Sequence, residues 1–259
     1  MAIVQTDALV IRSYRLGETS LIVSLFTSDY GLLRCVAKGA RGAKSRFGGA
    51  LEPGVRIRAI VYHKAQRDLH LLSKVDVVSY WPALWEDSER FTRAGAVLEF
   101  LERAAYGEAA DLTLLELAAE TLGAMGTAPL EALDAMLRAF EVQACRLLGY
   151  APELTACLEC RRPLAGGGLF HPVRGGLLCG APCGDDGGAF RLSEKARRTL
   201  VALAERPVPS VAGWIIERYP GPEVARAIER FLVAHLERFD GLRALRVGEQ
   251  LARYAGGSR

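Results

Sequence analysis

In the segment VRIRAIVYH, residues 55–63, apolar residues alternate with Arg56 and Arg58. A period of two places successive side chains on opposite faces of a β-strand, so the apolar residues face inward and the arginines outward. Four similar runs lie around it between Ile3 and Tyr80: ALVIRSYR, TSLIVSLFT, LLRCVAKG and LHLLSKVDVVSY. Five short strands predict a small β-barrel, for which an OB-fold is the leading candidate and an SH3-like barrel the alternative.

The apolar period becomes helical from Ser88 onward. The predicted helices include Asp111–Gly123, Pro129–Gly149 with a C-cap glycine, one that opens at Ser193, and a long amphipathic helix over Glu223–Leu245. The predicted fold class is therefore α+β. We expect an OB-fold domain over residues 1–79 and a mainly helical C-terminal domain over residues 80–259.

Two close cysteine pairs interrupt the helical part, Cys157 and Cys160 in CLEC and Cys179 and Cys183 in CGAPC. Each pair can hold a metal ion from one tight turn, and four thiolates satisfy tetrahedral zinc. The second pair has three intervening residues where two are commoner. The 18 residues between the pairs are rich in glycine, and a segment of about 40 residues of that composition could hardly fold alone. We predict one structural zinc per chain in a ribbon-like insertion over residues 153–190; disulfides or unrelated thiols are the alternatives.

Charge is distributed unevenly along the chain, although the formal net charge is only +3. Residues 1–79 carry 12 Lys and Arg against 6 Asp and Glu, and residues 80–150 carry 5 against 12. Residues 151–259 carry 16 against 12. A basic N-terminal part indicates a polyanion-binding module, while the acidic middle has another role.

The cations of the N-terminal part concentrate in one glycine-rich run without an acid between Arg34 and Glu52. Cations replace the counterions of a phosphate backbone, glycines permit close approach, and an aromatic ring stacks on bases. A flexible solvated loop is the alternative. The predicted DNA-binding residues are Arg34, Lys38, Arg41, Lys44, Arg46, Phe47, Arg56 and Arg58.

No catalytic motif is recognisable, since the chain lacks a phosphate-binding GxxxxGK[ST], a GxSxG and an HExxH sequence. Asp185 and Asp186 form the only adjacent pair of carboxylates near the cysteines, where a solvated turn is the simpler interpretation. The sequence therefore predicts a binding protein without catalytic residues. No apolar run approaches the ~20 residues of a membrane span, and no signal peptide is recognisable. We expect no membrane association and a reducing cytoplasm.

Several short motifs follow one another along the chain: Gly17-Glu18-Thr19-Ser20, Thr27-Ser28-Asp29-Tyr30-Gly31, Ala37-Lys38-Gly39-Ala40-Arg41, Lys44-Ser45-Arg46-Phe47, Leu51-Glu52-Pro53, and Phe170 with Gly175-Gly176 between the cysteine pairs. Each motif alone is weak, but in this order the chain resembles the RecO family of bacterial recombination mediators over essentially its whole length. The resemblance implies an N-terminal OB-fold, a helical domain with a zinc-ribbon-like insertion, and no enzymatic activity.

The resemblance also implies partners and a location near the bacterial nucleoid. Family members bind single- and double-stranded DNA, anneal complementary strands, and act with RecR to load RecA onto gapped DNA. They also bind the acidic C-terminal tail of single-strand-binding protein through the helical domain. Candidate contacts for that peptide are Arg226, Arg230, Arg238, Arg243 and Arg246, for which a solvated helix face is the alternative. Two other functions remain open: a zinc-containing RNA-binding factor with an OB-like barrel, and a nuclease that uses Asp185 and Asp186.

Overall fold

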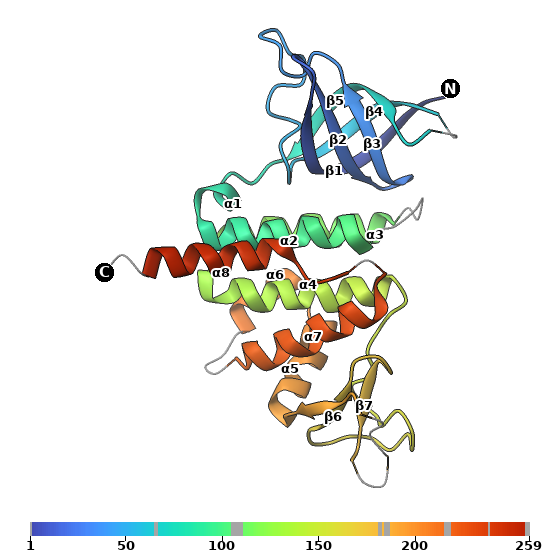
Figure 1. The fold of residues 1–259 in the computed structure, drawn as a ribbon, viewed down its shortest axis with the longest axis vertical. Helices are drawn as coiled ribbons and strands as arrows, with labels where there is room; N and C mark the ends of the chain where they lie inside the picture. Colours follow the sequence, from blue (N-terminus) through green and yellow to red (C-terminus); the bar gives the residue numbers. More distant parts are fainter. Residues whose placement is uncertain are drawn as a thin grey trace. The chain divides into compact units, whose positions relative to one another are not determined.

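The computed structural model describes residues 2–64, 67–104, 111–180, 183, 187–214, 219–237 and 239–256. The chain divides into two compact units, Met1–Gly126 and Thr127–Arg259, each with its own core (Figure 1). Asp185, Asp186 and Arg238, which the sequence analysis singled out, lie outside the described residues. In the described ranges, no helix has both the length and the apolar character needed to cross a bilayer.

The first unit contains a closed five-stranded barrel. Its strands are β1 (Ala2–Leu16), β2 (Ser20–Thr27), β3 (Gly31–Ala37), β4 (Arg56–His63) and β5 (His70–Ser79). The strand order is β1-β2-β3-β5-β4, and β1 closes the barrel by pairing with both β2 and β4. Strands β3 and β5 pair in parallel and all other neighbours are antiparallel. This topology confirms the predicted OB-fold over the SH3-like alternative.

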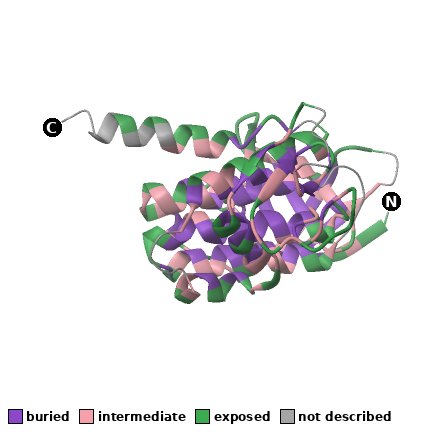
Figure 2. Ribbon diagram, turned by 90° about the horizontal axis from the view of Figure 1, so that it is seen from below, coloured by how far each residue is buried: buried purple, intermediate pink, exposed green. Residues whose placement is uncertain are grey.

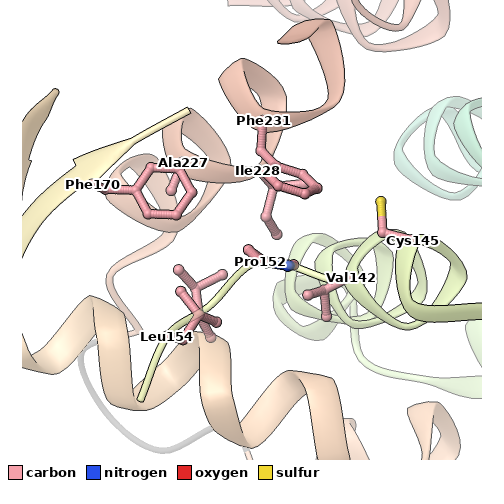
Figure 3. Close-up of a pocket in the computed structure, with 9 residues that line it drawn as sticks. Val142, Cys145, Pro152, Leu154, Phe170, Ala227, Ile228 and Phe231 are labelled. Atoms are coloured by element: carbon pink, nitrogen blue, oxygen red, sulfur yellow. The ribbon is translucent and has the colours of Figure 1, made fainter. Parts of the chain in front are cut away.

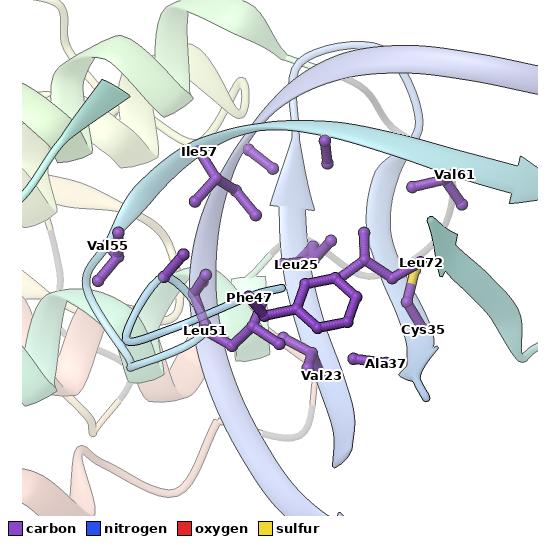
Figure 4. Packing of buried hydrophobic residues seen from close by; sticks show 14 of the residues in the cluster. Val23, Leu25, Cys35, Ala37, Phe47, Leu51, Val55, Ile57, Val61 and Leu72 are labelled. Atoms are coloured by element: carbon purple, nitrogen blue, oxygen red, sulfur yellow. The ribbon is translucent and has the colours of Figure 1, made fainter. Parts of the chain in front are cut away.

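The apolar side chains of the alternating pattern that predicted the strands fill the interior of the barrel. In β4 the side chains of Ile57, Ala59 and Val61 are fully buried, whereas Arg58 is exposed. The connection between β3 and β4 also enters the core, since Phe47 and Leu51 pack inside the barrel (Figure 4). The long connection is therefore attached to the barrel through apolar side chains.

Three helices complete the first unit: α1 (Ala83–Glu86), α2 (Ser88–Ala104) and α3 (Leu112–Thr127), which ends one residue beyond it. Carboxylates cap the two longer ones. The backbone N–H groups of Glu89 and Arg90 donate to Asp87 Oδ1, and that of Leu114 donates to Asp111 Oδ1 at 3.0 Å. These aspartates accept hydrogen bonds that the first helical turn leaves unpaired.

The second unit is built on α4 (Leu133–Leu147), which follows the 3₁₀ turn Leu130–Ala132 and is buried along most of its length (Figure 2). It contacts α5 (Glu194–Glu205), α6 (Val208–Trp214) and α7 (Gly221–His235). The predicted C-cap is confirmed, because Gly149 has a φ of 83° and its N–H donates to the Arg146 carbonyl. The predicted N-cap Ser193 accepts a hydrogen bond from the Ala196 N–H.

The prediction of one long helix over Glu223–Leu245 is wrong. Helix α7 ends at His235, and a separate helix α8 (Arg243–Gly256) follows an irregular connection. Gly241 in that connection has a φ of 92°, which other residues rarely adopt, and Arg246 donates a hydrogen bond to the Asp240 carbonyl. The amphipathic pattern of α7 and α8 continues through the break, so periodicity alone does not reveal it. None of the described side chains of α8 is buried (Figure 2).

The glycine-rich segment between α4 and α5 forms a small antiparallel sheet in the order β7-β6-β8. Its strands are β6 (Gly168–His171), β7 (Gly176–Leu178) and β8 (Phe190–Leu192). A Cβ added at Gly176 would lie 2.7 Å from the Glu153 carbonyl oxygen, so that close pairing requires glycine. These strands span only three or four residues each, and their few buried side chains include Leu177 and Leu192. The sheet and the four cysteines beside it are hereafter called the ribbon.

Candidate nucleic-acid interface and metal centre

The ribbon brings Cys157, Cys160, Cys179 and Cys183 together, with all four sulfur atoms within 4.8 Å of one another. The Sγ atoms of Cys160 and Cys179 are 3.8 Å apart. A tetrahedral site with zinc–sulfur bonds of about 2.3 Å has sulfur–sulfur edges of about 3.8 Å, so the donors fit zinc. Cys157 and Cys183 are buried, and Cys160 is exposed. The number and type of ligands match a closed structural site.

Backbone geometry positions the first cysteine pair. The N–H of Cys157 donates to the Arg162 carbonyl, and the N–H of Arg161 donates back to the Cys157 carbonyl at 3.0 Å. Arg161 has a φ of 60° and is the only non-glycine residue in the described ranges with a positive φ. This tight turn directs both sulfur atoms of the pair to one side, as a metal-binding turn requires.

The surroundings of Cys157 favour its thiolate form. Burial opposes ionisation of Cys157, but backbone N–H groups of Cys160, Cys179 and Glu159 outweigh it and lower the pKa of Cys157 to about 6. The N–H of Cys179 lies 3.4 Å from the Cys157 sulfur. The hydrogen bond with Cys179, then burial, and then the negative charge of an ionised Cys157 raise the pKa of Cys183. A divalent cation would relieve that repulsion, because it favours the thiolate form of every ligand.

The predicted DNA-binding cations of the glycine-rich run lie on β3 and in the connection between β3 and β4. Arg34 is exposed on β3, and Lys38, Lys44 and Arg46 are exposed in the connection that follows. Among the residues that the structure describes, none of these four forms an ion pair with an acid. Arg46 lies over the Phe47 ring at 5.2 Å, and its guanidinium remains exposed. These four cations are available for an anionic ligand.

Arg41 instead connects two parts of the barrel. Its guanidinium donates to the carbonyls of Gly17 and Glu18, and its N–H donates to the Thr19 carbonyl at 2.7 Å. These bonds fasten the basic connection to the turn between β1 and β2. Arg41 therefore positions the neighbouring cations, and only part of its donor capacity remains for a ligand.

Phe47 does not offer the stacking surface that the sequence analysis assigned to it. The side chain is only 3% exposed, and Figure 4 shows its ring inside the barrel near Val23, Leu25 and Leu72. A nucleobase could reach the ring only if the connection left the barrel. The aromatic residue in KSRF therefore anchors the basic connection to the hydrophobic core.

This burial leads to a testable expectation. Phe47→Leu should lower the free energy of unfolding by about 1 kcal/mol, because the smaller side chain fills the same apolar site less completely. The affinity for DNA should change less than twofold when measured by fluorescence anisotropy at a temperature where the variant is folded. A large loss of affinity without a loss of stability would show that Phe47 contacts DNA.

Arg56 and Arg58 face outward as predicted, but each already forms an ion pair with a carboxylate. Arg56 makes a bidentate ion pair with Glu116 on α3 at 2.5 and 2.9 Å. Arg58 pairs with Asp7 on β1 at 2.9 Å. The hydrogen bond that Arg56 donates to Glu116 raises the pKa of Arg56. Because these acids lie far from the arginines in sequence, no local pattern identified the pairing, and both arginines are weaker candidates than the four unpaired cations.

The predicted peptide-binding arginines fall into separate groups. Arg226 and Arg230, one turn apart on α7, lie over the same Phe190 ring at 4.4 and 5.3 Å. Arg246 donates to a carbonyl within the connection from α7 to α8, and Arg243 is exposed on α8. Of the four predicted arginines that lie in the described ranges, only Arg226 and Arg230 share a contact. Two exposed guanidinium groups beside one ring are suited to an anionic group.

An apolar pocket beside α7 is nearly closed. It is lined by Val142, Cys145, Pro152, Leu154, Phe170, Leu200, Ala227, Ile228 and Phe231 (Figure 3). Its volume of about 10 Å³ leaves room for little more than one water molecule. The nearby apolar residues Phe231, Phe239 and Leu242 are themselves buried. A bound aromatic side chain would require these residues to move or would lie on the surface.

Comparison with known proteins places both parts of the chain in one family. Residues 1–81 match the family model "Recombination protein O N terminal", and residues 86–245 match "Recombination protein O C terminal". A protein named DNA repair protein RecO from Anaeromyxobacter dehalogenans (strain 2CP-C) is 33% identical over 236 residues, which cover 91% of this chain and 92% of that protein. The protein of the same name from Symbiobacterium thermophilum is 31% identical and covers 92% of this chain and 94% of its own length.

Proposed function

Since this chain belongs to the RecO family, we propose that it acts in DNA repair as a recombination mediator. It binds single- and double-stranded DNA through the barrel and anneals complementary strands. The observation that carries this proposal is a group of exposed cations on β3 and in the connection after it, none of which pairs with an acid among the described residues. Arg41 and Phe47 hold that connection on the barrel. Contacts to phosphates from such a surface are independent of base sequence.

The second unit provides a surface for a protein partner. We assign Arg226 and Arg230 to the acidic C-terminal tail of single-strand-binding protein, because their two exposed guanidinium groups, which both lie over the buried Phe190 ring, can pair with carboxylates. RecR binding and the loading of RecA complete the proposed role. This work takes place on DNA in the cytoplasm and is carried out by binding, without catalysis.

The four-cysteine cluster has a structural part in this proposal. Cys157, Cys160, Cys179 and Cys183 would hold one zinc ion that stabilises the ribbon between α4 and α5. The ribbon connects to α7 through His235, whose Nε2 lies 2.9 Å from the Pro172 carbonyl oxygen. Zinc would thereby support the side of the second unit that carries Arg226 and Arg230, without contacting DNA.

Strand annealing tests the proposed function. The full-length protein should accelerate pairing of two complementary fluorescent oligonucleotides, and it should do so when both are coated with single-strand-binding protein. Deleting the tail of that protein should abolish the acceleration on coated strands and leave annealing of bare strands unchanged. A protein that binds structured RNA but neither binds nor anneals DNA would instead support the RNA-binding alternative.

A further inference from the structure

The outer face of the barrel carries an exposed tyrosine beside the basic connection. Tyr14 lies opposite Ile22 on β2, and Ile22 lies opposite Val36 on β3. The interior residues on these strands, such as Val23 and Cys35, alternate with this row, so the three side chains belong to the outer face. Tyr14 is 46% exposed. Its ring therefore lies at the edge of a small apolar strip that faces solvent.

A hydrogen bond and an ion pair restrain this tyrosine. The Nη1 atom of Arg12 donates to the Tyr14 hydroxyl oxygen at 3.2 Å, and Arg12 Nε pairs with Glu102 at 2.8 Å. Arg12 thus connects the ring to α2, in the same unit as the barrel. A ring that is restrained before binding loses less conformational entropy when a ligand stacks on it.

Cations lie next to this row of side chains. The neighbouring row runs from Arg12 through Ser24 to Arg34, so the exposed Arg34 is on the same outer face, two strands from Tyr14. Lys38 follows β3 directly. The bonds of Arg41 to the β1–β2 turn bring the basic connection to the end of the hairpin that carries Tyr14. An aromatic face and unpaired cations are therefore combined on one surface.

The other aromatic rings on the barrel strands are less exposed than Tyr14. Of the aromatic residues on strands β1 to β5, all within the described ranges, only Tyr14 is exposed. The rings of Tyr30 and His63 are 5.0 Å apart, and that of His70 stacks on His63 at 4.5 Å, so these rings contact one another.

We propose that Tyr14 is a stacking platform for a nucleobase of single-stranded DNA, with the adjoining phosphates on Arg34 and Lys38. This inference rests on the proposed DNA-binding function and adds a base contact to it. Every base has a π-face, so stacking adds affinity without reading the sequence. Stacking also requires an unpaired base, which gives the barrel a preference for single-stranded over double-stranded DNA that phosphate contacts alone do not supply.

The test compares Tyr14→Ala, Tyr14→Phe and a matched control, Tyr80→Ala, which removes another exposed tyrosine from the same unit. Affinity is measured for a single-stranded oligonucleotide and for an abasic oligonucleotide of equal length. Tyr14→Ala should bind the normal oligonucleotide about 5- to 100-fold more weakly, as expected for one stacked base. It should bind the abasic one as the wild type does. Tyr14→Phe keeps the ring but loses the hydrogen bond from Arg12, so it should lose much less affinity than Tyr14→Ala. Tyr80→Ala should retain wild-type affinity for both.

Cross-linking of the wild-type protein provides a result that does not depend on folding of a variant. Ultraviolet irradiation with an oligonucleotide containing 5-iodouracil should attach the base to the peptide that carries Tyr14. Equal weakening for normal and abasic oligonucleotides, or a cross-link elsewhere, would overturn the stacking role while DNA binding stands. A wild-type protein that binds neither oligonucleotide would overturn the proposed function itself.

Discussion

Replacing Cys157 with serine should abolish stoichiometric zinc and lower the free energy of unfolding of the second unit by about 4 kcal/mol or more. The reason is that β6, β7 and β8 span only three or four residues each, so their few buried side chains leave much of the stability of the ribbon to the free energy of metal binding. Elemental analysis should find about one zinc in the wild type, and thermal unfolding should measure the loss of stability. Hydrogen exchange should locate that loss in the ribbon.

Cys145→Ala is the matched control, because Cys145 is buried on α4 and lies outside the four-cysteine cluster. It should retain zinc. Acid should also release the metal, since protons compete with it for the thiolates. A metal-free wild-type protein with an intact, equally stable ribbon would contradict the zinc site.

Replacing Arg34, Lys38, Lys44 and Arg46 together with glutamine should weaken DNA binding on the order of 100-fold or more at 0.1 M salt. The plot of log K against log salt should become shallower by about 3, because each lost phosphate contact removes roughly 0.7 from its slope. The loss should be similar for all sequences. Arg41 is retained in this variant, since its bonds to Gly17 and Glu18 hold the connection in place.

A double variant with Arg58→Gln and Lys74→Gln is the control for lost positive charge. Both cations already pair with carboxylates, Asp7 and Asp76 respectively, at 2.9 Å. Their removal should change the salt dependence little. If the quadruple variant keeps the wild-type slope and remains folded, the principal DNA-binding surface lies elsewhere, and the basic α8 would be the next surface to test.

Local sequence determined the parts of this protein that depend on neighbouring residues. Alternation in segments such as Val55–His63 predicted the five strands, because period-two patterning is a property of a single strand. The two cysteine pairs predicted a metal cluster, since each pair forms its half of the site within one turn. The concentration of cations from Arg34 to Arg46 is likewise visible without a structure.

Tertiary structure decided which of those residues remain available. Phe47 follows the cations in sequence but enters the barrel core, and the charge of Arg56 is taken up by Glu116, sixty positions away. Tyr14 and Arg34 became neighbours on one face only through the pairing of β1, β2 and β3. Periodicity reports which side of an element is apolar, whereas burial and ion pairing depend on contacts between distant segments. The cations of the proposed DNA-binding surface could therefore be proposed from the sequence, but which of them are exposed and unpaired in the described ranges could be identified only from the fold.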